Sequence, residues 1–200
     1  MNSTLPLLKK TPKAFACLSV IAFFTLIACN GQNSPKVDLD KYKAKGDSIA
    51  LIAQGELLTH LSQAIADSGF AHAVNYCSLH ANELTNKALD SHSIVSIQRL
   101  SDKNRNADNA LKTAEEKAVF NRFNNSLTDT ITIQGDLITY YKPIRIMMPT
   151  CLNCHGKKNE LDVHVKEALQ IKYPNDLAID YSEGDLRGMW KIAMQKQKDN

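Results

Sequence analysis

Residues 150–156 read TCLNCHG, in which two cysteines and a histidine have the spacing C-x-x-C-H. This spacing is typical of c-type haem attachment, because each thiol can bond one vinyl group of the porphyrin and the adjacent imidazole can turn under the ring to coordinate iron. The motif therefore predicts one covalently attached haem c. Cys151 and Cys154 would be the thioether positions, and His155 would be the proximal iron ligand.

Three other roles for Cys151 and Cys154 are alternatives to haem attachment. A thioredoxin-like dithiol normally begins a helix after a βαβ pattern, whereas here Pro149-Thr150 and a predicted antiparallel hairpin precede the motif. A zinc site with His155 and His164 would normally have a second pair of ligands, which the sequence lacks. A plain disulfide is the third alternative. Haem attachment is favoured because it gives all three motif residues a role.

The N-terminal segment has the pattern of an export signal. Residues 1–13 carry three lysines, and residues 14–28 are uncharged and mostly apolar. This apolar run would rise only about 22 Å as a helix, less than the roughly 30 Å of a bilayer's hydrocarbon core. The pattern therefore favours a secretory signal over a membrane span.

The end of this segment, LIAC at residues 26–29, resembles a bacterial lipobox, whose cysteine becomes lipid-modified. We expect a lipoprotein-type signal peptide at 1–28, lipidation at Cys29 and a tether at 29–38. The protein would then be periplasmic and anchored to a membrane without spanning it. The alternative is cleavage without lipidation, which would leave a soluble periplasmic protein.

Charge and cysteine usage narrow the function classes. Three of the 24 basic residues and none of the 21 acidic ones precede residue 30, so the body of the chain is electrically balanced. This balance and the lack of a nucleic-acid-binding motif argue against nucleic acid as a partner. Of the five cysteines, Cys17 would leave with the signal and Cys29 would carry lipid. The odd number that remains argues against a framework made only of disulfides.

Hydrophobic periodicity predicts a single α+β domain at residues 39–200. Ser68-Gly69 separates two predicted helices, Thr113-Ala114-Glu115-Glu116 has the pattern of a capping box, and Gly135-Asp136 is a predicted hairpin turn. Residues 100–111 are expected to form a structured loop. The predicted helices are 39–67, 70–89, 113–127 and 160–172, and the predicted strands are 93–99, 130–134, 137–146 and 186–194.

The second axial position of the iron stays open when the residues are considered alone. Cys77 lies on the apolar stripe of the predicted helix 70–89, where a cysteine ordinarily acts as a small buried hydrophobe. His80 lies beside the same stripe and is an alternative ligand. Met147 and Met148 are further alternatives, although few residues separate them from the haem motif. The histidines expected to be solvated are His60, His92 and His164.

Four separated segments resemble the PAS-like c-type haem domain family, which was first described in cyanobacteria and was long treated as a domain of unknown function. The segment RLSDKNRNADN is specific to that family, and the resemblance covers roughly residues 45–195. The four segments are 73–77 (AVNYC), 99–109 (RLSDKNRNADN), 141–156 (YKPI to CLNCHG) and 173–188 (YPNDLA to GDLRG).

The resemblance implies a PAS-like antiparallel sheet with N-terminal helices. In the family, the axial ligands are the histidine of the haem motif and a cysteine of the N-terminal helical region, which implies Cys77 as the distal ligand opposite His155. Two positions depart from the family pattern. Ala107 stands where proline is usual, and residues 189–191 (MWK) replace a segment of small residues. Neither departure removes a ligand.

Basic residues of the 99–109 segment are candidate partners of the haem propionates. Arg99, Lys103 and Arg105 would hold the loop over these carboxylates, since a guanidinium pairs with a carboxylate in fork geometry. Their alternative role is a solvated surface network. Arg187 and Tyr173 also match family positions, but no role can be assigned to them.

Thiolate ligation by Cys77 predicts a low reduction potential, because the anionic sulfur stabilises ferric iron. Reduction would weaken the iron–sulfur bond and open a position for a diatomic gas. We therefore expect a redox or gas sensor that signals through a separate protein, with an electron-transfer cytochrome as the alternative. Enzymatic activity is not expected, because a peroxidase-like reaction requires an open iron position and a distal acid-base pair.

Overall fold

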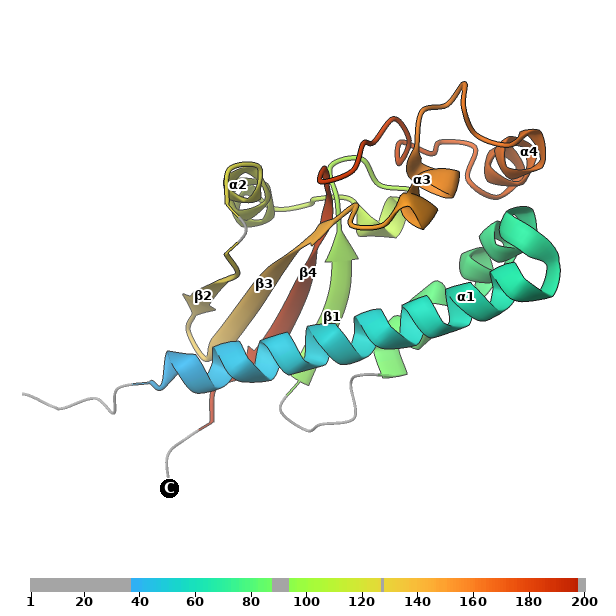
Figure 1. Ribbon diagram of the computed structural model, residues 1–200. Coiled ribbons are helices and arrows are strands. Elements are labelled where there is room, and N and C mark those ends of the chain that lie inside the picture. Colours follow the sequence, from blue (N-terminus) through green and yellow to red (C-terminus); the bar gives the residue numbers. More distant parts are fainter. Residues whose placement is uncertain (1–36, 88–93, 127, 198–200) are drawn as a thin grey trace, which may run out of the picture. The chain divides into compact units, whose positions relative to one another are not determined.

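The computed structural model describes residues 37–87, 94–126 and 128–197. Its helices and strands confirm the predicted α+β class (Figure 1). The elements are α1 (Leu39–Asn86), β1 (Ile94–Leu100), the short 3-10 helix η2 (Ala107–Asn109), α2 (Ala114–Phe123), β2 (Thr130–Gln134), β3 (Leu137–Arg145), α3 (Pro149–His155), α4 (Val163–Lys172) and β4 (Leu186–Gln195).

Some predictions lie outside these ranges. They concern the signal peptide, the lipidation site Cys29, most of the tether and His92. Among the helices that the structure describes, none is both long and apolar enough to cross a membrane.

The four strands form one antiparallel sheet in the order β1-β4-β3-β2. The predicted hairpin joins β2 and β3, and Gly135 in its turn has a φ of 59°, which glycine adopts without a steric penalty. The last strand, β4, pairs with β1 on one side and β3 on the other. Runs of consecutive buried side chains along β4 show that both of its faces are covered, as expected for a central strand.

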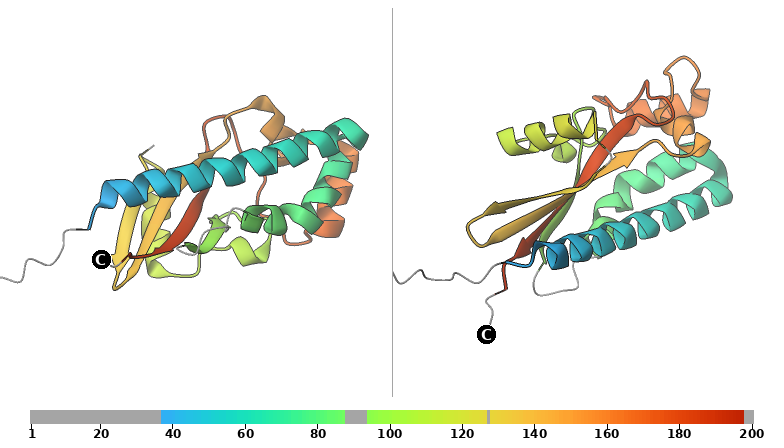
Figure 2. Two further views of the ribbon diagram at one scale, coloured as in Figure 1. Left: turned by 90° about the horizontal axis from the view of Figure 1, so that it is seen from below. Right: turned by 60° about the vertical axis from the view of Figure 1, so that its left-hand side comes forward.

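Helix α1 consists of two arms, because its backbone leaves the helical conformation at Ser68 and Gly69. Gly69 has a φ of 78°, a left-handed value that favours glycine. The arms fold back on each other (Figure 2), and the ring of Tyr76 in the second arm stacks 6.2 Å from the ring of His60 in the first. The break confirms the two predicted helices, although the second ends at Asn86.

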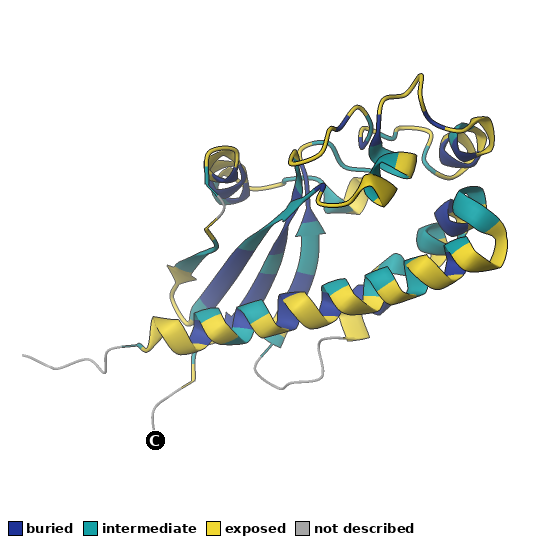
Figure 3. Cartoon of the chain, in the orientation of Figure 1, coloured by how far each residue is buried: buried dark blue, intermediate teal, exposed yellow. Residues whose placement is uncertain are grey.

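The first arm of α1 crosses one face of the sheet, with its buried residues turned toward the strands (Figure 3). Gly46 allows the closest approach, since the ring of Tyr140 on β3 lies where a side chain at position 46 would begin. The next residue on β3, Tyr141, points to the opposite face and packs with Phe120 and Phe123 of α2. The sheet is thus covered by α1 on one face and by α2 on the other.

Glu116 links α2 to the sheet and completes the predicted capping box at Thr113. Its carboxylate is 4% exposed and accepts hydrogen bonds from Lys191 Nζ at 2.7 Å and from the amides of Lys112 and Thr113 at 2.7 and 2.9 Å. Burial alone would raise the pKa of Glu116. The hydrogen bonds from Lys191 and from the two amides outweigh burial and lower that pKa below its ordinary value.

This lowered pKa predicts a pH-dependent contribution to stability. Because Glu116 binds its proton more weakly in the folded than in the unfolded state, its contribution is present above about pH 4.3 and is lost as the pH falls through the folded pKa. We expect Glu116→Gln to lower the free energy of unfolding at pH 7 by about 1 kcal/mol and to flatten its decline below pH 5. Urea unfolding at several pH values measures both effects. Parallel declines in the two proteins would contradict this prediction.

Candidate functional site

The C-x-x-C-H motif lies on α3, a short helix that directly follows β3 and the two methionines after it. Pro149 occupies the first turn of α3, where its missing N–H costs no hydrogen bond. No helix is predicted here from the residue pattern, and the expectation that the cysteines do not lie at a helix start is wrong. A thioredoxin-like dithiol is still disfavoured, because β3 belongs to an antiparallel sheet and, among the described residues, no βαβ unit precedes the motif.

His155, the last residue of α3, is fixed by one strong hydrogen bond. Its Nδ1 donates to the carbonyl oxygen of Ala178 over 2.7 Å, and its ring meets that of Tyr181 edge-on, with the centroids 6.2 Å apart. Burial, with repulsion from the charges of Arg187 and Arg105, lowers the pKa of His155 well below its ordinary value. The imidazole is therefore neutral, with a protonated Nδ1 and a lone pair on Nε2 that can bind a metal.

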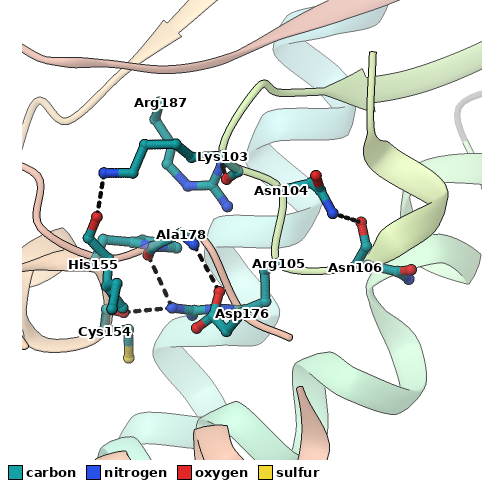
Figure 4. A network of polar contacts seen from close by, with 10 residues as sticks. Lys103, Asn104, Arg105, Asn106, Cys154, His155, Asp176, Ala178 and Arg187 are labelled. Carbon is teal, nitrogen blue, oxygen red and sulfur yellow. Dashed lines mark hydrogen bonds and ion pairs between the residues drawn. The ribbon is translucent and has the colours of Figure 1, made fainter. Parts of the chain in front are cut away.

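Arg105 holds the Ala178 carbonyl in place (Figure 4). Its Nη2 donates to the carbonyl oxygens of Cys154 and Ala178 over 2.6 and 3.2 Å, and its Nε donates to Asp176 Oδ2 over 3.0 Å. The other oxygen of Asp176 accepts a hydrogen bond from the amide of Ala178 at 2.8 Å. One arginine thus ties the loop before η2 both to the haem motif and to the segment that orients His155.

The structure brings Cys77 from the second arm of α1 to the same site. Cys77, Cys151 and Cys154 are free and partly buried. Burial raises the pKa of Cys77, and the nearby positive charges of Arg99 and Arg105 oppose this rise. Burial also raises the pKa of Cys154, and Cys77 contributes to that rise, which places the two thiols within electrostatic reach of each other.

The other ligands considered from the sequence are engaged elsewhere or exposed. The ring of His80 lies 4.5 Å from that of Tyr76, and its Nδ1 is 3.9 Å from Glu83. Met147 is 69% exposed and Met148 43% exposed. His164 lies on the surface beside Glu167. In the described ranges, no three histidine, cysteine or carboxylate side chains are grouped closely enough to hold a metal ion.

The three basic residues that the sequence predicted as propionate partners differ in the contacts they make within the protein. Lys103 Nζ donates to the carbonyl of Ile179 and lies 4.2 Å from the centroid of the Tyr181 ring, whereas Arg105 pairs with Asp176. Arg99 lies over the ring of Trp190 at 6.0 Å. The sequence analysis assigned these basic residues to propionates, but it gave Arg187 no role and did not single out Tyr181.

Arg187 and Tyr181 nevertheless belong to the site. The guanidinium of Arg187 lies 5.6 Å from the centroid of the Tyr181 ring. Within the described residues, neither Arg187 Nε nor Tyr181 Oη, both buried, makes a hydrogen bond of ordinary length, which is costly unless a ligand supplies a partner. No pattern in the sequence around Tyr181 distinguishes it from a core tyrosine.

Comparison with known proteins identifies the family. The sequence model of the Tll0287-like family matches residues 28–195. The chain belongs to the Tll0287-like family. Its fold is similar to that in the crystal structure of the cyanobacterial heme-protein Tll0287, with a TM-score of 0.61 and 21% sequence identity over 80% of this chain and 98% of that chain. No curated protein matches the chain.

Membership of the Tll0287-like family confirms the resemblance that the four sequence segments indicated. The likeness to the Tll0287 structure also confirms the predicted α+β, PAS-like architecture. At 21% identity this likeness concerns the fold alone, so the chemistry of the site has to be argued from the side chains described above.

Proposed function

We propose that this member of the Tll0287-like family is a monohaem c-type haem protein. Cys151 and Cys154 would attach the porphyrin, and His155 and Cys77 would be the axial iron ligands. The observation that carries this proposal is the hydrogen bond from His155 Nδ1 to Ala178, which leaves Nε2 available beside three free cysteines.

The polar groups at the site fit a haem. A haem presents two carboxylates to its protein, and the site offers buried donors without partners at Arg187 Nε and Tyr181 Oη. The positive charges of Arg187 and Arg105 near His155 also suit an anionic cofactor. The apolar cluster around Cys154, which includes Val74, provides packing for the ring.

When bound, a haem supplies a one-electron couple and a coordination position that a diatomic gas can occupy. The protein's part is to hold a neutral imidazole at His155 and to present a thiol at Cys77. Metal coordination deprotonates a thiol, so Cys77 would contribute a negative charge that the cations nearby offset. This ligand set supports a low reduction potential.

We further propose that the protein senses redox state or a diatomic gas and passes the signal to a partner protein. This role is supported by the origin of the two ligands, since His155 comes from α3 and Cys77 from the second arm of α1. Release of Cys77 would free that arm, which is joined to the first arm at Gly69. The alternative role is electron transfer, and exposed Met147 beside the haem motif favours it as a contact for a redox partner.

We propose no catalytic role, because His80, the histidine nearest to Cys77 along the chain, is engaged with Tyr76.

Export and lipid anchoring are also part of the proposal, and the signal-like pattern of residues 1–29 supports them. We expect the mature protein to begin at Cys29 with the mass of attached acyl chains. Cys29→Ala should lose that added mass, and a wild-type protein without it would contradict lipidation.

The axial assignment predicts distinct spectra for two variants. Cys77→Ser should keep the covalently attached haem but change the ferric absorption spectrum, because the thiolate ligand is lost. His80→Ala is the matched control on the same helix and should leave the spectrum unchanged. An unchanged spectrum in Cys77→Ser, or a changed one in His80→Ala, would contradict Cys77 as the distal ligand.

A second measurement distinguishes the two proposed roles. If the protein is a sensor, carbon monoxide or nitric oxide should readily displace one ligand in the ferrous form. If it is an electron carrier, both ligands should stay bound in both oxidation states, and ligand exchange should be slow. A wild-type protein without any Soret band, made in cells that mature c-type cytochromes, would contradict the haem itself.

A further inference from the structure

Two of the four basic side chains near His155 have no anionic partner in the part of the chain that the structure describes. Arg105 is paired with Asp176, and Lys103 is bonded to the carbonyl of Ile179. Among the described residues, neither Arg99 nor Arg187 forms an ion pair with a carboxylate. The polar contact of Arg187 is a long one, from Nη1 to the carbonyl of Lys103 at 3.4 Å.

A strand irregularity directs Arg187 toward the site. Ile144 of β3 pairs with Gly188, but the next residue, Arg145, pairs with Leu186, so Arg187 is the extra residue of a bulge in β4. A bulge interrupts the alternation of side chains and often re-aims one of them beside a functional site. Arg187 accordingly lies over the ring of Tyr181, whose other neighbours include His155.

Arg99 reaches the same region from the neighbouring strand. It is paired in register with Trp190 on β4, and its guanidinium lies over the Trp190 ring. An arginine packed on an aromatic face keeps its N–H donors free in the ring plane to bind a carboxylate. Trp190 lies in the MWK segment that departs from the family pattern, so this support for Arg99 is a feature of this chain.

The charge of Arg187 acts on the guanidinium of Arg99. Burial lowers the pKa of Arg99, and the charge of Arg187 lowers it further. Burial likewise lowers the pKa of Arg187. A guanidinium that is partly withdrawn from water and feels a like charge is destabilised, unless an anion compensates the charge. A ligand with two negative charges would neutralise the pair.

We infer that Arg99 and Arg187, with the Tyr181 hydroxyl, form the binding site for the two haem propionates. This inference rests on the proposed function. Arg105 and Lys103 instead hold the surrounding loops, because their donors are already bound to Asp176 and to carbonyl oxygens. Arg99 therefore keeps the propionate-binding role that the sequence predicted for it. Arg187, to which the sequence gave no role, is assigned the same role here.

The inference is tested on the holoprotein by resonance Raman spectroscopy, in which the low-frequency propionate bending band reports hydrogen bonding to these carboxylates. We expect the band to shift in Arg99→Gln and Arg187→Gln, and the midpoint potential to fall in both, since loss of a cation favours ferric iron. Arg187→Lys should restore much of the potential but little of the band position, because lysine keeps the charge without the fork.

Two controls separate this role from general effects of charge. Arg122→Gln removes an exposed arginine at the end of α2 and should change neither readout. Lys117→Gln, which removes an exposed cation of the same helix, should also leave the propionate band in place. The wild-type protein provides a further comparison, because its band should differ from that of the haem peptide released by proteolysis, whose propionates are free in water. This comparison requires no variant to fold.

A wild-type band identical to that of the free haem peptide would overturn the inference. So would unchanged bands in both Arg99→Gln and Arg187→Gln, or a band that shifts only in Arg122→Gln. In each of these cases haem is present and the proposed function stands. A wild-type protein that carries no haem would instead overturn the proposed function together with the inference.

Discussion

Arg105→Gln is expected to lower the free energy of unfolding by about 3 kcal/mol, because it leaves Asp176 buried without its cation. The side chains of Arg105 and Asp176 are only 14% and 9% exposed, so water can replace little of the lost interaction. The substitution also removes the donors to the carbonyls of Cys154 and Ala178. The loop before η2 and the segment that orients His155 would then lose the side chain that joins them.

Urea unfolding of the holoprotein measures this effect, and two further variants define its cause. Arg105→Lys should be less destabilised, because it keeps the charge although it loses the fork geometry. The double variant Arg105→Gln with Asp176→Asn should lose less free energy of unfolding than the two single variants lose together, since no buried charge remains unpaired. Strict additivity would show that Arg105 and Asp176 do not act as a pair.

The parts of the fold that sequence patterns predicted are those with local causes. Ser68-Gly69 marks the break in α1, and Gly135 marks the β2–β3 hairpin, because both glycines have positive φ. α3 has only seven residues, too few for a helical repeat to show, and a proline at its start is as compatible with an interruption of regular structure as with a helix start. The order β1-β4-β3-β2 depends on contacts between segments far apart in the chain, which periodicity does not reveal.

The candidate site also has some features with local causes and others that depend on distant parts of the chain. The spacing of Cys151, Cys154 and His155 is local, so the motif could be recognised from the sequence. The acceptor for His155 is the backbone carbonyl of Ala178, 23 residues away, and every residue carries such a carbonyl. The direction of Arg187 follows from a bulge in β4, and side-chain alternation predicts the opposite face. The sequence therefore indicated the candidate ligands, His155 through its motif and Cys77 through the family resemblance, but it could not show the groups that surround and position them.

Gly46→Ala is expected to destabilise the protein because it separates α1 from the sheet. A Cβ at position 46 would lie 2.4–2.7 Å from three carbon atoms of Tyr140. The ring cannot move aside, since Tyr140 is fully buried and its hydroxyl donates to Asp47 and Asp129 at 3.0 and 2.8 Å. Overpacking of this kind costs about 3 kcal/mol, and the higher helix propensity of alanine recovers about 1 kcal/mol, which leaves a net loss of about 2 kcal/mol.

Gly55→Ala is the matched control for this prediction, because it makes the same change in the same arm of α1. A Cβ at position 55 would meet no atom within 4 Å, so the substitution should stabilise the protein by about 0.5–1 kcal/mol through helix propensity alone. Opposite shifts of the urea midpoint in the two variants would locate the contact between α1 and β3 at Gly46. If Gly46→Ala were as stable as Gly55→Ala, α1 would not be packed against Tyr140, and the position of the Cys77 arm relative to the sheet would have to be revised.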